Sequence, residues 1–225
     1  MYSSAVRRSR VIRRSGSARP AFWSAAVTRQ LGRGPDHILG TTRRTKASRL
    51  ETTEITIEAN PGTVSYGNLL ELRRIGINRI SYGVQSANTE ELRMLERLHN
   101  FLDVIEAVTS ARKAGFDNLN LDLIYGLPEQ TLQTWQTTVS RILDLRPDHI
   151  SAYALTLEHG TPFGRWASKG LLPLPDPDLA AEMYEWLSDE LEAQGYSQYE
   201  ISNWALDTQR STIVGPIIGL QPATL

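Results

Sequence analysis

The 225-residue chain contains no cysteine. Disulfides, thiolate catalysis and any metal or iron–sulfur cluster held by cysteine are therefore excluded within this chain, and cysteine usage gives no redox compartment. Long apolar runs are missing as well, because none approaches the roughly 20 residues that a helix needs to cross a bilayer. We therefore expect no membrane span.

Acidic residues are scarce in the first 50 positions. This segment holds 12 of the 24 Lys and Arg residues and one acid, Asp36, so it carries +11 while the remaining 175 residues carry −12. It is rich in Arg and Ser and shows no sustained period of 2 or 3.6, which predicts disorder. A mitochondrial or plastid transit peptide has this composition. A nucleic-acid arm is not favoured, since aromatics beyond Phe22 and Trp23 are lacking. We favour an unstructured extension without function.

From Glu51 onward the sequence alternates strand and helix signals. Strict apolar and polar alternation predicts strands, and apolar residues at helical spacing predict helices. Strands are expected at 54–60, 78–86, 118–125, 149–158 and 196–203, and helices at 68–75, 89–98, 102–114, 132–145 and 178–194. This rhythm favours an α/β fold with a parallel sheet, either open or closed into part of a barrel.

The stretch 118–131 (N-L-N-L-D-L-I-Y-G-L-P-E-Q-T) shows the unit most clearly. Leucines alternate with Asn120 and Asp122, so a strand here has one apolar and one polar face. Gly126 and Pro128 end it. Thr131 is expected to cap the helix that begins at Leu132, because its hydroxyl can accept a free backbone N–H of the first turn.

Three strands carry a polar face. A parallel sheet covered by helices on both sides reads as a nearly continuous apolar run, so these polar faces indicate an open lumen. Glu58, Gln85 and Asp122 all lie near the carboxyl ends of their strands, where α/β sheets and barrels bind ligands. The pattern suggests a hydroxyl- or amine-bearing ligand held by two carboxylates and an amide. The alternative is a structural charged layer, in which Arg79 or Arg97 neutralises Glu58 or Asp122.

The four histidines show no metal-ligand spacing. We interpret His37, His99, His149 and His159 as ordinary surface or strand-end residues, and expect no metal ligands and no catalytic residues.

Four blocks resemble the radical SAM proteins related to oxygen-independent coproporphyrinogen III oxidase, most closely their haem-chaperone (HemW) branch. The blocks are E-I-T-I-E-A-N-P-G-T-V (54–64), I-N-R-I-S-Y-G-V-Q-S (77–86), N-L-D-L-I-Y-G-L-P-E-Q-T (120–131) and Y-E-I-S-N (199–203). The resemblance runs from about Glu51 to Ala205. It implies a partial (β/α) barrel of the radical SAM type whose open end holds S-adenosylmethionine and a [4Fe-4S] cluster.

The same resemblance assigns five cofactor-binding positions. Glu58 is similar to the residue that contacts the methionine amine region, and Asp122 to the ribose-binding carboxylate. Gln85 and Arg97 resemble polar contacts to the cosubstrate. Thr156, at the end of the fourth strand, is placed on the adenine side.

The chain also departs from this family. The three cluster cysteines (Cys-x3-Cys-x2-Cys), the glycine-rich Gly-Gly-Gly-Thr-Pro loop and the first two barrel strands have no counterpart, and residues 206–225 do not follow the family. We therefore expect three parts: a disordered Arg/Ser-rich segment at 1–50, a truncated radical SAM barrel at 51–205 and an unrelated tail at 206–225. Such a chain reads as the central part of a longer protein.

Two functions follow from the resemblance. The first is that of a radical SAM protein of porphyrin metabolism, binding S-adenosylmethionine and handling haem or porphyrin, here without the cluster and so without its oxidoreductase activity. The alternative is a non-catalytic binding or interaction module, or an inactive barrel remnant with an exposed strand edge. The expected location is cytoplasmic, or mitochondrial or plastid if residues 1–50 are a transit peptide.

Overall fold

The computed structural model describes residues 28–29, 54–157, 162–170 and 173–206. Residues 1–50, expected to be disordered, and the unrelated tail expected at 206–225 lie outside the described residues, apart from a short strand at 28–29 and Leu206. Within the described part, no helix is long and apolar enough to cross a membrane.

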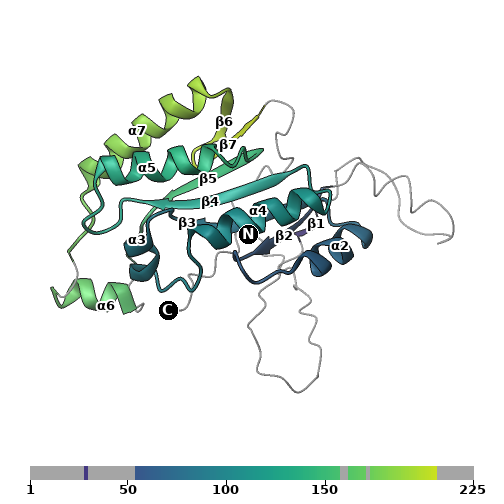
Figure 1. Cartoon of the computed structure of the whole chain (residues 1–225). Coiled ribbons are helices and arrows are strands. Elements are labelled where there is room, and N and C mark those ends of the chain that lie inside the picture. The colour runs from purple at the N-terminus through teal and green to yellow at the C-terminus, as the bar shows by residue number, and fades with distance from the viewer. Residues whose placement is uncertain (1–27, 30–53, 158–161, 171–172, 207–225) are drawn as a thin grey trace, which may run out of the picture.

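Seven strands form one sheet in the order β1-β2-β3-β4-β5-β7-β6 (Figure 1). They are β1 (Thr28–Arg29), β2 (Ile55–Ala59), β3 (Arg79–Gln85), β4 (Leu119–Tyr125), β5 (His149–Ala154), β6 (Tyr196–Glu200) and β7 (Asn203–Leu206). Strands β2 to β5 are parallel, as the alternating pattern predicted. Strand β1 pairs antiparallel with β2, so part of the outer edge of β2 is covered.

The helices are α2 (Tyr66–Arg74), α3 (Thr89–Met94), α4 (Phe101–Lys113), α5 (Leu132–Leu143), α6 (Pro162–Ser168) and α7 (Pro177–Ala193). Helix α6 lies where the sequence predicted only a loop. Thr131 caps α5 as expected, since its Oγ1 accepts the N–H of Thr134 at 3.2 Å. Asn88 caps α3 in the same way.

The last part of the described chain differs from the prediction, which was a single strand over 196–203. Two strands, β6 and β7, occupy this region, and only Ile201 and Ser202 separate them. Because a two-residue connection can only reverse the chain, β6 and β7 pair antiparallel, and β7 also pairs antiparallel with β5. The sheet is therefore mixed, and the expectation of an all-parallel sheet was wrong for this hairpin.

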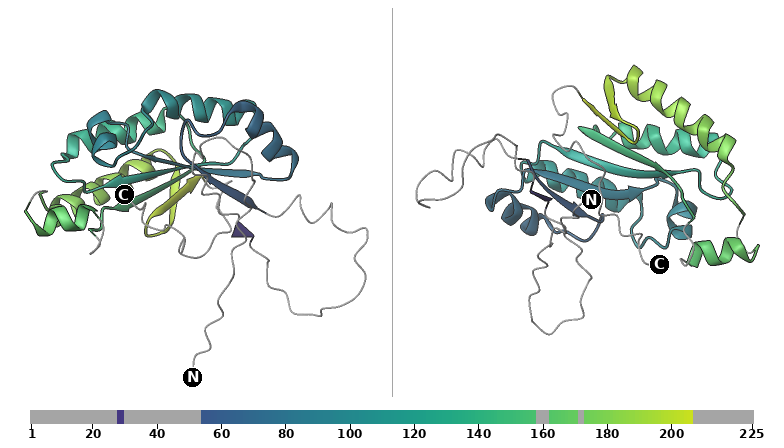
Figure 2. Two further views of the ribbon diagram at one scale, coloured as in Figure 1. Left: turned by 90° about the horizontal axis from the view of Figure 1, so that it is seen from below. Right: turned by 180° about the vertical axis from the view of Figure 1, so that it is seen from behind.

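Helices pack on one face of the sheet, as the two views of Figure 2 show for α2, α4 and α5. The apolar side chains of each strand point to that face and form the core with the helices. They are Ile57, Ile80, Tyr82, Val84, Leu119, Leu121, Leu123, Ile150 and Ala152. At 25 cal/mol per Å² of buried apolar surface, each large side chain here contributes about 1.5–3 kcal/mol. The polar parity is thereby left on the opposite face.

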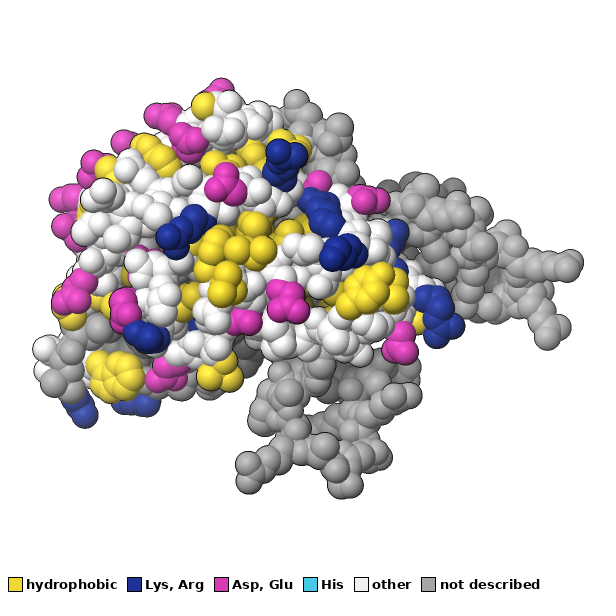
Figure 3. Space-filling model, viewed as in Figure 1, with side chains coloured by type: hydrophobic (Ala, Val, Ile, Leu, Met, Phe, Trp, Pro, Cys, Tyr) yellow, Lys and Arg dark blue, Asp and Glu magenta, His cyan; other side chains and the backbone are white. Residues whose placement is uncertain are grey.

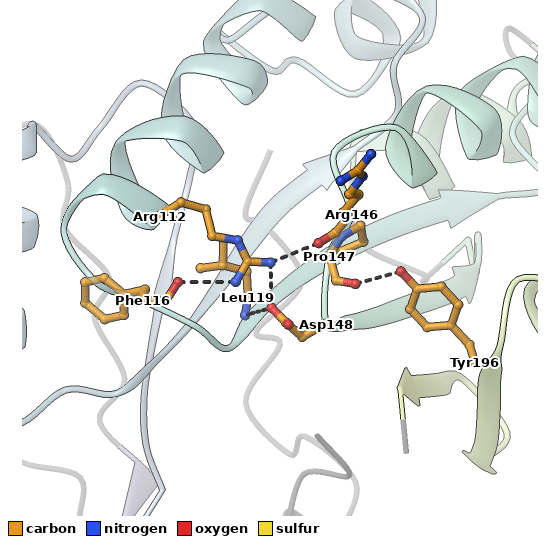
Figure 4. A network of polar contacts seen from close by, with 7 residues as sticks. All are labelled: Arg112, Phe116, Leu119, Arg146, Pro147, Asp148 and Tyr196. Atoms are coloured by element: carbon orange, nitrogen blue, oxygen red, sulfur yellow. Dashed lines mark hydrogen bonds and ion pairs between the residues drawn. The ribbon is translucent and has the colours of Figure 1, made fainter. Parts of the chain in front are cut away.

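A polar network joins the amino-terminal ends of β4 and β5 to helix α4 (Figure 4). The guanidinium of Arg112 donates to the carbonyl oxygens of Phe116 (3.2 Å) and Arg146 (2.9 Å) and lies 2.7 Å from the carboxylate of Asp148. That carboxylate also accepts the N–H of Leu119 at 2.9 Å. This end of the sheet is thus fastened by structural contacts, whereas the ligand-type residues lie toward the other end.

Candidate functional site

Two carboxylates share the polar face of the sheet. Glu58 comes from β2 and Asp122 from β4, and both are half-buried. Burial raises the pKa of Glu58, the negative charge of Asp122 raises it further, and the positive charge of Arg79 opposes both. The two carboxylates are thus close enough to influence each other, although β3 lies between their strands.

Asp122 is held by neighbouring side chains. Its Oδ2 accepts the hydroxyl of Ser81 at 2.9 Å, and its Oδ1 accepts the side-chain amide of Asn120 at 2.6 Å. Burial raises the pKa of this carboxyl, while these hydrogen bonds and the charge of Arg79 act against the rise. Such bonds fix the orientation of a carboxylate that remains available to an additional donor.

Gln85 ends β3 in a strained turn. Its φ is +70°, and the N–H of Ser86 donates to the carbonyl of Val84 at 2.9 Å, which closes a γ-turn around Gln85. A non-glycine residue in this region costs about 1–3 kcal/mol, and such strain concentrates at functional positions. The strand pairing with β4 shifts at the same place.

Gly83 leaves room for two side-chain amides. A Cβ added at this position would lie 3.0 Å from Nε2 of Gln85 and 3.1 Å from Oδ1 of Asn60. Because Gly83 pairs with Asp122 across β3 and β4, both amides gather beside that carboxylate. Asn60 was not predicted to belong to the site, and its closeness to Gly83 is the observation that adds it.

Arg97 lies in the connection between α3 and α4, because α3 ends at Met94 rather than continuing to Leu98 as predicted. Its Nε is buried and has no hydrogen-bond partner, and burial lowers its pKa. The neighbouring His99 is 3.0 Å from the carbonyl of Val84 through its Nε2. This contact ties the connection to the end of β3, next to Gln85.

Thr156 stands apart from the other four. It is exposed and lies two residues beyond the end of β5. Among the described residues, no hydrogen bond links it to Glu58, Gln85 or Asp122.

Arg79 does not form the ion pair that the structural alternative required. Within the described part of the chain, neither Glu58 nor Asp122 makes a salt bridge with it. Arg79 is buried, its Nε has no hydrogen-bond partner, and its NH1 lies 3.5 Å from Oγ1 of Thr56. Its charge acts on both carboxylates through space.

The interpretation of the histidines as ordinary surface or strand-end residues was wrong for His99, which is buried in the connection between α3 and α4. His149 is the first residue of β5, at a strand end as expected, but it is buried as well. His99 is 8% exposed and His149 1% exposed. His149 belongs to the polar face, with Nδ1 2.5 Å from Oδ1 of Asn120 and Nε2 2.5 Å from the hydroxyl of Tyr199. Sequence reasoning missed these contacts because Tyr199 lies on β6, and no pattern in the sequence indicates that the β6–β7 hairpin joins the sheet next to β5.

A separate cleft of about 250 Å³ lies between α5 and the connection that follows β3. None of the five predicted residues lines it. The lining consists of Ala87, Asn88, Gln133, Thr134, Thr137, Thr138 and Arg141. This cleft is therefore distinct from the polar face.

The hydrogen-bonding groups on the polar face suit a ligand that carries hydroxyl and amine groups. The carboxylates accept hydrogens from such groups, and the unsatisfied guanidinium N–H can donate to an oxygen or nitrogen of the ligand. They do not suit an iron–sulfur cluster, which requires thiolates, since the chain has no cysteine. The described residues also contain no group of three or more His, Asp or Glu side chains arranged to hold a metal ion.

Curated relatives match about two thirds of the chain. The heme chaperone HemW of Lactococcus lactis is 42% identical over 153 residues, which cover 68% of this chain and 40% of the relative. The mouse protein "Radical S-adenosyl methionine domain-containing protein 1, mitochondrial" is 40% identical over 159 residues, covering 71% of this chain and 36% of the relative. The chain thus spans about two fifths of the length of these relatives.

A solved structure gives the same fold. Coproporphyrinogen III oxidase (HemN) of Escherichia coli, a radical SAM enzyme, superposes with a TM-score of 0.62 at 29% identity, covering 70% of this chain and 36% of that one. The expected partial radical SAM barrel is therefore confirmed. The family model of the radical SAM superfamily matches residues 22–142. The match therefore begins inside residues 1–50, the segment that was expected to be disordered. With more than half of its residues in this match, the chain belongs to the radical SAM superfamily.

Proposed function

We propose that the chain binds S-adenosylmethionine on the polar face, across the carboxyl ends of β2, β3 and β4. The observation that carries this proposal is the grouping of Glu58, Asp122 and Gln85 on one face, beside a glycine that leaves space for them. These three residues come from three separate strands, so their grouping is a property of the fold.

Each side chain has a role that its chemistry allows. Asp122, oriented by Ser81 and Asn120, would accept the ribose hydroxyls, and Glu58 would accept the amine of the methionine part. Gln85 would bond polar groups between them. The unsatisfied Nε of Arg97 would find an acceptor on the cosubstrate. Thr156 would line the adenine side from the end of β5.

The radical reaction of the family is not part of this proposal. That chemistry starts when an electron passes from a [4Fe-4S] cluster to the sulfonium of S-adenosylmethionine, and this chain provides no thiolate to hold the cluster. What its own residues do is bind and orient the cosubstrate. We propose a binding protein rather than an oxidoreductase.

We further propose that this binding serves haem or porphyrin handling. Its support is the similarity to relatives named heme chaperones, from Lactococcus lactis and other bacteria. The location we propose is cytoplasmic, with the mitochondrion as the alternative, since one group of relatives is named mitochondrial. A haemin titration of the full chain, followed by its absorbance spectrum, tests the haem part independently.

Calorimetric titration of S-adenosylmethionine into the full chain tests the binding proposal. The wild-type chain should bind, and Asp122→Ala should weaken binding at least tenfold, because it removes the acceptor of two ribose hydroxyls. Asp117→Ala is the matched control: this carboxylate is exposed, precedes the opposite end of β4 and should leave the affinity unchanged. A folded wild-type chain that binds nothing would favour the inactive barrel remnant instead.

A further inference from the structure

Asn120 has a single possible orientation in its surroundings. Its Nδ2 lies 2.6 Å from Oδ1 of Asp122 and 2.7 Å from Oγ of Ser81, so both amide hydrogens are used. Its Oδ1 consequently faces the other way, toward Nδ1 of His149 (2.5 Å) and Oγ of Ser151 (3.2 Å). Turning the amide over would direct its oxygen at the carboxylate oxygen of Asp122, and neither atom could donate a hydrogen to the other.

The orientation of Asn120 determines the tautomer of His149. An amide oxygen only accepts, so Nδ1 of His149 must carry the hydrogen. In a neutral imidazole Nε2 is then an acceptor, and the hydroxyl of Tyr199 donates to it across 2.5 Å. Burial, helped by the positive charge of Arg79, lowers the pKa of His149 to about 3, so the ring stays neutral at physiological pH.

The result is a directed chain of hydrogen bonds from the hairpin to the candidate site. It runs from Tyr199 on β6 through His149 on β5 and Asn120 on β4 to the carboxylate of Asp122. At each step of this path a donor faces an acceptor. Burial raises the pKa of the Tyr199 phenol to about 12, which keeps it a donor.

We propose that Tyr199 and His149 are positioning residues that hold the Asp122 carboxylate in its ligand-binding orientation through Asn120. This inference rests on the proposed function for its ligand, S-adenosylmethionine. It gives the β6–β7 hairpin a role in binding, although the hairpin lies outside the parallel strands that carry Glu58, Gln85 and Asp122.

Two conservative variants separate positioning from general stability. Tyr199→Phe removes the hydroxyl at the start of the chain of bonds and keeps the ring. Tyr196→Phe is the matched control, because Tyr196 lies on the same strand and its hydroxyl donates to the carbonyl of Pro147 at 2.6 Å, away from the site. Each variant loses one hydrogen bond of a tyrosine hydroxyl and keeps the ring, so both should lose only the stability that one such bond provides.

The first measurement needs no ligand. Nitrogen-15 NMR of the full chain should show His149 as the Nδ1–H tautomer, and carbon-13 NMR should follow the titration of the Asp122 carboxyl. Tyr199→Phe should raise the pKa of Asp122, since Asn120 becomes free to turn and its hydrogen bond to the carboxylate weakens. The other charged and titratable groups that act on this carboxyl, Glu58, Arg79 and Tyr153, are the same in the variant and the wild type.

The second measurement is the affinity for S-adenosylmethionine. Tyr199→Phe should weaken binding about fivefold, the equivalent of one typical hydrogen bond, and Tyr196→Phe should not. If Tyr199→Phe leaves both the Asp122 titration and the His149 tautomer unchanged, the positioning role is wrong. If the wild-type chain fails to bind, the proposed function fails, while the ligand-free NMR still decides the positioning role.

Discussion

At the scale of single residues, Gly83 controls the space next to Asp122. We predict that Gly83→Ala lowers the affinity for S-adenosylmethionine about three- to tenfold, because the new methyl group displaces the side-chain amides of Gln85 and Asn60, which would lie 3.0 and 3.1 Å from it. Calorimetry measures the change.

The control for this substitution is Gly67→Ala, in the exposed first turn of α2. Its Cβ would meet only Oγ of Ser65, at 3.9 Å. It should stabilise the fold by up to about 1 kcal/mol, because alanine favours a helix over glycine, and leave the affinity unchanged. Equal affinities for wild type and Gly83→Ala would show that the two amides do not contact the ligand.

His149 gives the fold a predictable dependence on pH. Its pKa is about 3 in the folded chain and about 6.5 in the unfolded chain, so below pH 6.5 the unfolded state binds the proton and the folded state does not. The contribution of His149 to the free energy of unfolding is therefore complete above pH 6.5 and is lost as the pH falls toward 3. Between pH 7.5 and 5 the loss amounts to about 2 kcal/mol.

Urea unfolding at several pH values measures this effect. Glu58 and Asp122, whose pKa values are raised, act in the opposite direction because their folded forms keep a proton longer. The comparison with His149→Gln isolates the histidine: the variant should be less stable at pH 7.5 but should lose less stability on acidification. A parallel pair of stability curves would contradict the prediction.

At the scale of secondary-structure elements, Arg112 joins α4 to the starts of β4 and β5 (Figure 4). We predict that Arg112→Met lowers the free energy of unfolding by about 2–3 kcal/mol, because it leaves the half-buried carboxylate of Asp148 and two carbonyl oxygens without this donor. Denaturant unfolding measures the change. The affinity for S-adenosylmethionine should stay the same, since this network lies at the opposite end of the strands from Gln85.

Arg93→Met serves as the comparison for an exposed ion pair. Arg93 contacts Glu90 within α3, and the two side chains are 69% and 76% exposed. Such pairs contribute less than about 0.5 kcal/mol, so this variant should unfold almost like the wild type. Equal losses for the two arginine variants would mean that the network of Arg112 is no stronger than a surface pair.

Helix α4 and the connection before it carry an apolar patch on the helical face of the sheet. Leu98, Leu102 and Ile105 are 104%, 74% and 37% exposed; Leu98 precedes α4, and Leu102 and Ile105 lie within its first turns. Figure 3 shows apolar side chains gathered on this face of the molecule. The stripe of α4 that contains Val104 and Val108 is buried instead, because that side of the helix packs on the sheet.

At the scale of the whole molecule, the lack of cysteine determines the chemistry. We predict that anaerobic reconstitution of the full chain with iron and sulfide leaves no [4Fe-4S] absorption band after desalting, because no thiolate is present to hold the cluster. Absorbance and iron content measure the result. A cluster band that survives desalting would overturn both this prediction and the proposal of a binding protein without radical chemistry.

The sequence by itself determined which faces the strands present. The strict alternation around Glu58 and Asp122 assigned their parity, because side chains alternate across any strand whatever its neighbours are. Capping by Thr131 was equally predictable, because it depends on atoms within one helical turn. The absence of cysteine excluded the cluster without any knowledge of the fold.

Only the tertiary structure decided how these local features combine. The return of β6 and β7 beside β5 places Tyr199 against His149, and no local pattern encodes contact between residues 50 positions apart. The shift in strand pairing at Gln85 and the burial of Nε of Arg97 also depend on segments that meet only in the folded chain. Sequence periodicity reports the direction of a side chain, whereas strand order and register decide which side chains meet.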